Sequence, residues 1–348
     1  MIRRRKSKPI NVGDVTIGGG APVVIQSMAK TDTRDAKATI RQIRQLERCG
    51  CQLVRVAVPD REAADSLSDI KKAINIPLIA DIHFDHRLAL AAIDAGVDGL
   101  RLNPGNIRDP QHIKKVVLAA REREIPIRIG VNAGSLPPTK DATKSTVERM
   151  VDAAMNEIDL LESLDFGLIK VSLKAFDVPE TIEANRIIAK RMPYPIHLGI
   201  TESGTPRRGS IRSAVGIGIL LWEDIGDTIR VSLTGDPSQE VSAGYEILKS
   251  LGLSKRGPTL ISCPTCGRTE IDVVSLANAV EKRLDKIEKP VKVAVMGCVV
   301  NGPGEAKNAD IGIACGKGKG IIFSRGKQVR TVNESEFLTA LMAEIDRF

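Results

Sequence analysis

Three cysteines near the C-terminus have a spacing that could hold a metal centre. The chain reads ISCPTCGRTE at 261–270 and VAVMGCVVNGPGEAKNADIGIAC at 293–315. The two thiolates of CPTC can reach one metal from a tight turn, and Cys298 supplies a third ligand. For the fourth position, Cys315 would complete a four-cysteine zinc site, whereas Glu305 would complete an iron-sulfur site. The spacing alone does not decide between zinc and iron.

A glutamate as fourth ligand would change the chemistry of such a site. A carboxylate is a harder and more exchangeable ligand for iron than a thiolate, so one iron would remain able to bind a substrate oxygen. A cluster of this kind could act both as a Lewis acid and as a one-electron source.

A second pair of cysteines, Cys49 and Cys51, occurs in LERCGCQLVRV. The chain has six cysteines and no secretion signal, so they are expected to be thiols, ligands or catalysts and not a disulfide framework. We interpret Cys49 and Cys51 as small core residues.

Charged and polar residues recur near the C-terminal ends of the strands that the sequence predicts. They are Arg55, Asp81, His83, Arg101, Asn103, Arg128, Asn132, Lys170, Lys174, Glu202, Arg230 and Ser232. Several lie two or four residues apart, so they share one face of a strand. Burying a cation without a partner costs several kcal/mol, and two carboxylates are too few to pair all these cations. The pattern predicts a site for a phosphate or diphosphate; an internal ion-pair network is the structural alternative.

The elements that must position these residues follow a repeating pattern. Eight short apolar runs are predicted strands, at 22–28, 53–58, 77–83, 99–105, 125–132, 167–175, 195–204 and 227–235, and helical patterns separate them. Eight such units over about 250 residues predict a (β/α)8 barrel of the TIM type, whose active sites lie at the C-terminal ends of the strands. A doubly wound sheet is the alternative.

The pattern changes after Gly252. We predict a barrel domain at 1–252 that binds the substrate, a linker at 253–258 and a small α+β domain at 259–348 that holds the cluster. The eighth helix should end at the face opposite the barrel mouth, and a linker this short spans at most ~25 Å. We therefore expect a homodimer in which the small domain of one chain caps the barrel of the other.

Composition excludes several classes of protein. No apolar run approaches the ~20 residues of a membrane span, and the N-terminus has no secretory signal, so we expect a cytoplasmic protein that does not bind membranes. The net charge of +8 is compatible with nucleic-acid binding, but the chain has only six Phe, two Tyr and one Trp and no RNA- or DNA-binding motif. We therefore expect no nucleic-acid partner.

The motifs together resemble those of a known enzyme family. SCPTCGR, GCVVNGPGE, GITESG, ADIHF, LRLNPGN and IRIGVN are similar, in kind and order, to motifs of the 4-hydroxy-3-methylbut-2-enyl diphosphate synthases of the non-mevalonate isoprenoid pathway. The resemblance covers essentially the whole chain and fits the two-domain bacterial form. It implies reductive ring opening and dehydroxylation of 2-C-methyl-D-erythritol 2,4-cyclodiphosphate, with electrons taken one at a time from flavodoxin or ferredoxin.

The resemblance also implies roles for individual residues. It implies a 4Fe-4S cluster on Cys263, Cys266, Cys298 and Glu305, which leaves Cys315 out, and a homodimer. It implies a diphosphate site at Arg55, Arg101, Asn103, Arg128, Asn132, Lys174, Arg230 and Ser232, and acid-base chemistry at Glu202 with Asp81 and His83 nearby. The competing interpretation is a non-redox barrel enzyme that acts on a phosphorylated or pterin-like substrate and carries a structural zinc ribbon.

Overall fold

The computed structural model describes residues 4–82, 85–102, 109–136, 143–298, 304 and 309–348. His83, Asn103 and Glu305, for which the sequence predicts functions, lie outside these residues. The chain forms two compact units, Met1–Ser254 and Lys255–Phe348, which are described separately. Within the described ranges, no helix has the length and apolar content needed to cross a bilayer.

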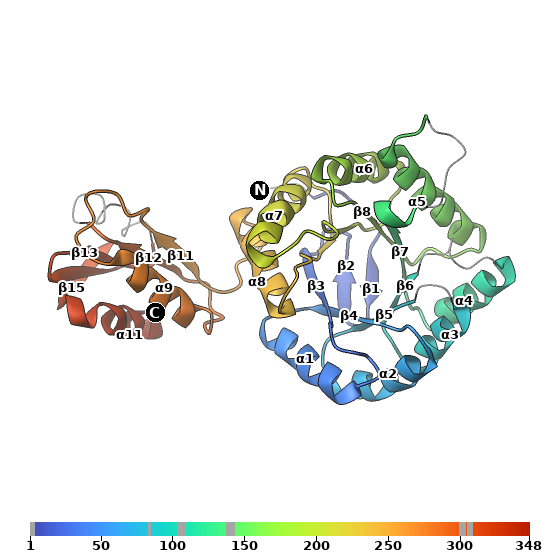
Figure 1. Ribbon diagram of the computed structural model, residues 1–348, viewed down its shortest axis with the longest axis horizontal. Helices are drawn as coiled ribbons and strands as arrows, with labels where there is room; N and C mark the ends of the chain where they lie inside the picture. The colour runs from blue at the N-terminus through green and yellow to red at the C-terminus, as the bar shows by residue number, and fades with distance from the viewer. Residues whose placement is uncertain (1–3, 83–84, 103–108, 137–142, 299–303, 305–308) are drawn as a thin grey trace. The chain divides into compact units, whose positions relative to one another are not determined.

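Eight parallel strands form the barrel of the first unit (Figure 1). They are β3 (Val24–Met28), β4 (Leu53–Ala57), β5 (Leu78–Asp81), β6 (Gly99–Leu102), β7 (Ile127–Asn132), β8 (Ile169–Lys174), β9 (His197–Leu198) and β10 (Thr228–Ile229). Their order is β8-β7-β6-β5-β4-β3-β10-β9, and a parallel bridge between Val171 and Ile196 joins the two ends. The TIM-type barrel predicted from the sequence is confirmed.

Within the described ranges, eight helices cover the outside of the barrel. They are α1 (Ala36–Arg48), α2 (Arg61–Ala73), α3 (His86–Asp94), α4 (Pro110–Glu122), α5 (Thr146–Ser163), α6 (Val178–Arg191), α7 (Pro206–Trp222) and α8 (Pro237–Ser250). Most begin at a residue whose carboxylate accepts a hydrogen bond from a free backbone N–H of the first turn: Asp35, Asp60, Asp85, Asp109, Asp177 and Asp236. These caps fix the point at which each loop from a strand enters its helix.

Two of the barrel strands are much shorter than the sequence predicts. The predicted strands at 195–204 and 227–235 are realised as the two-residue strands β9 and β10. Beyond them the chain turns, because Glu202 has a left-handed backbone with φ of 53° and Gly204 one of 106°. The ends of the two predicted strands therefore form loops at the mouth of the barrel.

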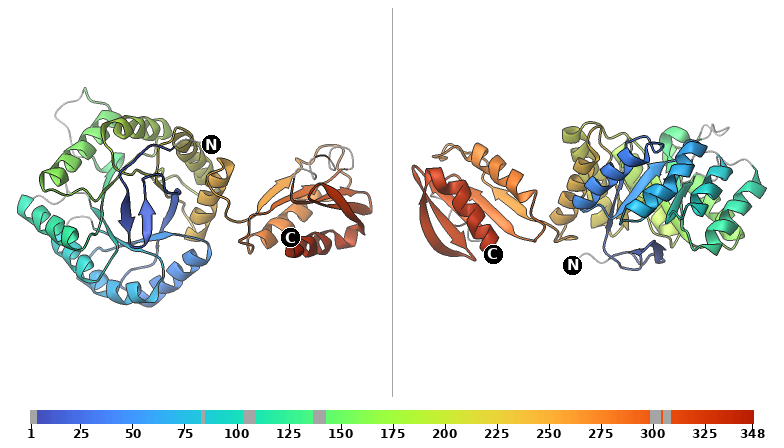
Figure 2. Two further views of the ribbon diagram at one scale, coloured as in Figure 1. Left: turned by 180° about the vertical axis from the view of Figure 1, so that it is seen from behind. Right: turned by 90° about the horizontal axis from the view of Figure 1, so that it is seen from below.

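A hairpin that the sequence analysis missed closes the other end of the barrel. It consists of the three-residue strands β1 (Ile10–Val12) and β2 (Val15–Ile17). Its apolar side chains pack against Val24, Leu53 and Ile79, which lie at or near the N-terminal ends of their strands. The hairpin lies across that end of the barrel (Figure 2).

In its described residues, the second unit consists of a five-stranded mixed sheet with two helices packed on it. Its strands, in spatial order, are β11 (Thr259–Ser262), β12 (Lys292–Met296), β13 (Ile311–Gly316), β14 (Lys319–Ser324) and β15 (Lys327–Asn333). The helices α9 (Val273–Leu284) and α11 (Phe337–Arg347) share an apolar core with the sheet. The first three strands are parallel, so the ends of β11 and β12 that lead into CPTC and GCVVNGPGE lie at the same edge.

Candidate active site

A cavity of about 250 Å³ lies at the C-terminal ends of the barrel strands. Its described lining consists of Arg55, Asp81, Arg101, Arg128, Asn132, Ser172, Lys174, Thr201, Arg230 and Ser232. Among these ten residues, five are Arg or Lys and one, Asp81, is an acid. The barrel interior thus brings together side chains from seven of the eight strands or the loops that follow them.

Asp81 lies between two of the arginines. Its Oδ2 is 3.4 Å from Nε of Arg55, and its Oδ1 is 3.2 Å from Nη1 of Arg101. Arg101 also donates from Nη2 to the carbonyl oxygen of Gly130, at 3.1 Å. One carboxylate therefore fixes two guanidinium groups, whereas Arg128 and Lys174 form no ion pair within the described residues.

The excess of buried cations shifts their protonation equilibria. Burial, and then the nearby Arg55 and Arg101, lower the pKa of Arg128 well below its usual range. Burial lowers the pKa of Arg55 to about 10, although Asp81 opposes the shift. Burial, and then Arg128, lower the pKa of Lys174 as well. An anion with several charged oxygens would raise these pKa values again, because a nearby negative charge stabilises the protonated forms of Arg and Lys.

Two glycines in the barrel interior make room for these cations. A Cβ atom at Gly130 would lie 2.6 Å from Nε of Arg101, and one at Gly199 would lie 2.6 Å from Nζ of Lys174. Neither distance is compatible with a side chain at the glycine. A glycine inside a strand often marks such a close approach, so the glycines of IRIGVN and HLGI are a signal of this packing in the sequence itself.

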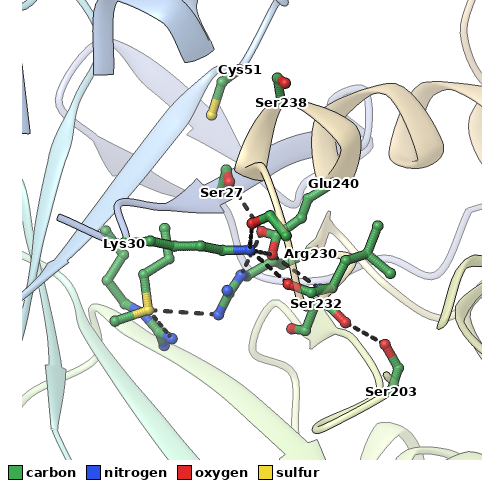
Figure 3. Close-up of polar contacts among 12 residues, drawn as sticks. Ser27, Lys30, Cys51, Ser203, Arg230, Ser232, Ser238 and Glu240 are labelled. Atoms are coloured by element: carbon green, nitrogen blue, oxygen red, sulfur yellow. Dashed lines mark hydrogen bonds and ion pairs between the residues drawn. The ribbon is translucent and has the colours of Figure 1, made fainter. Parts of the chain in front are cut away.

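Glu240, on the first turn of α8, is a buried carboxylate in contact with Arg230 of the cavity lining (Figure 3). Its Oε2 accepts from Oγ of Ser27, at 3.2 Å, and from Nε of Arg230, at 3.3 Å. Its Oε1 accepts from the backbone N–H of Leu233, at 3.0 Å, and is 3.0 Å from Nζ of Lys30. One carboxylate thus links β3 to the loop after β10 and takes up one N–H of Arg230. Glu240 was not among the residues predicted from the sequence.

Lys30 is held by the same loop. Its Nζ donates to the carbonyl oxygens of Leu233 and Gly235, both at 2.6 Å, and pairs with Glu240. Its hydrogen-bonding positions are therefore taken by protein acceptors. Lys30 stabilises the loop that carries Ser232 and leaves the contact with an anion to the other cations.

Glu202 lies on the turn next to Thr201, which lines the cavity. Its backbone adopts a left-handed conformation with φ of 53°, which costs a residue with a side chain about 1 kcal/mol or more. Two contacts offset this cost, because Oγ of Ser203 donates to the carbonyl oxygen of Ser232 and Thr234 N–H donates to Gly204 O, at 2.9 Å. The Glu202 side chain is exposed and is not part of the cavity lining.

Lys170 and His197 lie deeper in the barrel. Nζ of Lys170 and Nε2 of His197 are buried and form no hydrogen bond within the described part of the chain. His197 Nδ1 is 2.7 Å from Oγ1 of Thr228. Burial, and then Arg128, lower the pKa of Lys170 to about 7, and burial lowers the pKa of His197 too. Near neutral pH, His197 is therefore uncharged and Lys170 is only partly protonated, so burial removes positive charge below the cavity.

The structure brings most of the residues predicted for the substrate site into one cavity. Arg55, Asp81, Arg101, Arg128, Asn132, Lys174, Arg230 and Ser232 line it. Glu202 is next to it in the chain, and His83 and Asn103 are outside the described residues. Ser172 and Thr201 join the lining without having been predicted, since a hydroxyl on an apolar strand gives little signal.

Three of the four predicted cluster ligands lie in described parts of the second unit. Cys263 directly follows β11, and Cys298 follows β12 by two residues, on the neighbouring parallel strand. Sγ of Cys263 accepts from the backbone N–H of Gly297, at 3.3 Å. A backbone hydrogen bond from Arg268 lowers the pKa of Cys266. Among the described residues, no three His, Cys, Asp or Glu side chains already converge on one point, and Glu305 lies outside them.

Cys315 has a different environment from these three cysteines. It lies in β13 within the apolar core of the second unit, and burial raises the pKa of its thiol to about 12. A thiol of this kind stays protonated near neutral pH, whereas metal ligation needs the thiolate. Cys51 is likewise buried in the barrel core, and burial raises its pKa to about 12.

The sequence matches two family models that together span most of the chain. Residues 7–245 match the GcpE TIM-barrel domain, and residues 259–347 match the GcpE protein C-terminal domain. A relative from Dehalococcoides mccartyi, named 4-hydroxy-3-methylbut-2-en-1-yl diphosphate synthase (flavodoxin), is 62% identical over 345 residues, or 99% of each chain. A relative of the same name from Thermodesulfovibrio yellowstonii is 57% identical over 99% of each chain. Another, from Geobacter sulfurreducens, is 54% identical over 99% of this chain and 98% of its own.

The fold is also similar to solved structures of dihydropteroate synthases. The enzyme from Stenotrophomonas maltophilia has a TM-score of 0.52 and 14% identity, over 66% of this chain and 92% of its own. The Yersinia pestis enzyme has a TM-score of 0.52 and 10% identity, over 70% of this chain and 98% of its own. At such low identity these likenesses concern the barrel fold alone. By its full-length relatives, the chain belongs to the GcpE family of 4-hydroxy-3-methylbut-2-en-1-yl diphosphate synthases.

Proposed function

We propose that this protein is an iron-sulfur oxidoreductase that converts 2-C-methyl-D-erythritol 2,4-cyclodiphosphate to 4-hydroxy-3-methylbut-2-enyl diphosphate. The observation that carries the proposal is the cavity in which five Arg and Lys side chains face one acid among the described lining, inside a chain whose full-length relatives bear the name of this enzyme. The pterin-like alternative receives no support from the dihydropteroate synthase structures, since they are at most 14% identical in the two comparisons above.

The proposal assigns the barrel to the substrate. Arg55, Arg101, Arg128, Lys174 and Arg230 would bind the phosphate oxygens, with Asn132 and Ser232 as neutral donors and Asn103 as a further contact. Arginine suits this task because its planar guanidinium can donate two hydrogen bonds to one phosphate. Asp81 would keep Arg55 and Arg101 in place before the substrate arrives.

Glu202 is the proposed acid-base residue. Its exposed carboxylate follows Thr201 at the cavity wall, where it could deliver a proton to the hydroxyl that leaves C3. The strained backbone at this position is held by Ser203 and Gly204, so the carboxylate would be positioned before the reaction. His83 belongs to the same proposal as a neighbouring group.

The second unit, residues 259–348, is the proposed cluster domain. Cys263, Cys266, Cys298 and Glu305 would hold a 4Fe-4S cluster, and the donors fit: Cys263 and Cys298 end neighbouring parallel strands, and backbone N–H groups point at the sulfur atoms of Cys263 and Cys266. When bound, the cluster would supply two electrons one at a time and an open iron for the substrate hydroxyl. Flavodoxin, which the relatives' names contain, or ferredoxin would be the donor.

The proposal includes a homodimer in which the cluster domain of one chain caps the barrel of the partner. The short segment after α8 supports it, because that helix ends at Ser250 and the first unit at Ser254. Closure of the mouth would exclude water from the reacting centre. A location in the cytoplasm stays a prediction.

The proposal can be tested with protein purified and reconstituted without oxygen. The cyclic diphosphate and a chemical reductant should yield the linear diphosphate, and Arg128→Met should raise KM for the cyclic diphosphate by about a hundredfold, since charged hydrogen bonds contribute roughly 1.5–3 kcal/mol each. A colourless, zinc-containing protein that leaves the cyclic diphosphate unchanged would contradict the proposal.

A further inference from the structure

Lys170 lies inside the barrel, one step below the substrate cavity. It precedes Ser172 and Lys174 on β8, and both of these line the cavity. Because side chains alternate along a strand, the three residues share the inner face of β8. Lys170 itself is not among the described lining residues, and only 2% of its surface is exposed. It is therefore a buried amine that lies beneath the site without lining it.

The groups around Lys170 are mostly basic. Arg128 is its partner in the register of β7 and β8, and Arg55 of β4 is a second cation that acts on it. On the other side is β9, which carries His197. Burial lowers the pKa of this imidazole well below its usual value, so it is neutral. Nζ of Lys170 forms no hydrogen bond within the described part of the chain.

The acid that acts on Lys170 is Asp227, which directly precedes β10. Its Oδ1 is 3.3 Å from Nη2 of Arg4, and both of its oxygens also accept hydrogen bonds from other groups. Its negative charge is therefore shared with Arg4. Burial, and then Arg128, outweigh Asp227, so the pKa of Lys170 falls to about 7. The amine is thus poised between its two protonation states near neutral pH.

A diphosphate in the cavity would change this balance. The proposed phosphate contacts include Arg128, which is beside Lys170 in the register, and Lys174, which is four residues further along the same strand. A negative charge about 10 Å away, at an effective dielectric constant of about 20, raises the pKa of an amine by about one unit. Occupancy of the cavity should therefore shift Lys170 toward its protonated form.

The reaction assigned above increases the demand for positive charge. Opening the ring breaks a bond between a carbon and a phosphate oxygen, so one phosphate gains a second ionisable oxygen. The ionised substrate takes up two electrons and one proton, and this proton leaves with the hydroxyl as water. The product therefore carries one negative charge more than the substrate. An amine that can be protonated from solvent balances this change without a further permanent charge among the buried cations.

We propose that Lys170 is a proton store for the substrate cavity: its buried amine is only partly charged in the free protein and takes up a proton from solvent when a diphosphate binds. The inference rests on the substrate of the proposed function and names a further residue of the same site. Lys170 acts through its charge and not through contact, so its effect depends on pH. Well below pH 7 it is already protonated, and well above its pKa in the complex it stays neutral, so proton uptake is largest between about pH 7 and 8.

The test is calorimetric binding of the cyclic diphosphate to the full-length holoprotein at pH 7.5. No reductant is added, so the ligand is not converted. Titrations in HEPES and in Tris, whose ionisation enthalpies differ, give the number of protons taken up per bound ligand. Lys170→Met removes the amine, and Lys72→Met, on the exposed surface of α2, is the matched control. Circular dichroism confirms that each variant is folded.

The wild type and Lys72→Met should take up about half a proton more than Lys170→Met, as a pKa rise of about one unit from about 7 implies at this pH. Kd of Lys170→Met should be about threefold higher than that of the wild type at pH 7.5 and equal to it near pH 9. Equal proton uptake in the three proteins, or a difference in Kd that persists at pH 9, would overturn the inference and leave the proposed function intact. A cyclic diphosphate that binds to none of the proteins would overturn both.

Discussion

Gly130 and Arg101 share one small space in the barrel: a Cβ atom at position 130 would lie 2.6 Å from Nε of Arg101 and 3.1 Å from its Nη2. Arg101 cannot simply move away, because its guanidinium pairs with Asp81 and donates to Gly130 O. The missing side chain is thus what allows the arginine to point into the cavity.

Gly130→Ala should therefore displace Arg101 without unfolding the barrel. We expect KM for the cyclic diphosphate to rise about tenfold, which corresponds to ~1.4 kcal/mol, with a smaller change in kcat. Gly134→Ala is the control, because nothing lies within 4 Å of the Cβ position there. Steady-state kinetics measure both variants, and equal KM values for the two would show that Arg101 does not bind the substrate.

Glu240→Gln should weaken substrate binding through Arg230. The glutamine amide has only one acceptor oxygen, whereas the carboxylate uses one oxygen for Nε of Arg230 and the other for Lys30 and the Leu233 N–H. We therefore expect Arg230 to lose its orientation. We expect KM to rise about tenfold and kcat to change less, and we expect the effect to vanish when Arg230 is already Ala. The measurement is KM of the wild type, of Glu240→Gln, of Arg230→Ala and of the protein with both substitutions.

Glu246→Gln provides the control for Glu240, since Glu246 is exposed on the same helix and pairs with Lys249, at 2.5 Å. If net charge alone governed affinity, loss of the Glu240 carboxylate would make the cavity more positive and lower KM. A lower KM would therefore refute the positioning role.

Much of the site was predictable because strand side chains alternate in direction. Arg55, Arg101, Arg128 and Lys174 were found because polar residues at the ends of apolar runs must face an interior that is otherwise dry. Glu240 was not predictable in this way. It lies on a helix, and its contacts with Ser27 and Arg230 exist only once the barrel has closed.

The fold was predictable to a similar extent. Eight apolar runs with helical patterns between them predict a barrel, and the order of the strands follows from the right-handed connection of each unit. The hairpin of β1 and β2 was missed because three-residue strands carry too few residues for a periodic pattern. The lengths predicted for the strands at 195–204 and 227–235 were wrong. The chain turns after β9 because the left-handed backbone of Glu202 is held by tertiary contacts such as that of Ser203 with Ser232.

Lys170→Met should stabilise the protein in the absence of substrate. Burial lowers the pKa of Lys170 to about 7, below its value of about 10.4 in the unfolded chain. Between these two values the unfolded chain binds more protons, so the free energy of unfolding rises with pH across this window. Replacing the lysine by methionine removes the cost of burying the amine. We expect the free energy of unfolding to rise by roughly 1–4 kcal/mol at pH 7.

Urea unfolding between pH 7 and 9 measures the effect of Lys170→Met, with exposed Lys72→Met as the control. The variant should also lose the part of the pH slope that Lys170 contributes. An unchanged or lower stability at pH 7 would mean that Lys170 is charged and paired in the folded protein. A large rise in KM would place its Nζ on the substrate.

Mixing two inactive chains tests whether the cluster domain serves the partner's barrel. Glu202→Gln and Cys298→Ser should each abolish turnover, because one lacks the acid and the other a cluster ligand. In a capped dimer, a mixed pair contains one site with both defects and one with neither, so equal mixing should restore about a quarter of the activity. If each chain serves its own barrel, no mixture regains activity.

The reaction itself gives the most direct test of the central claim. Protein reconstituted without oxygen to about four iron ions and four sulfides per chain is given the cyclic diphosphate and an excess of reductant, and the products are identified by mass spectrometry. The account predicts that the cyclic diphosphate is consumed and that 4-hydroxy-3-methylbut-2-enyl diphosphate appears in equal amount. Cyclic diphosphate that remains unchanged in the presence of a fully loaded and reduced protein would contradict it.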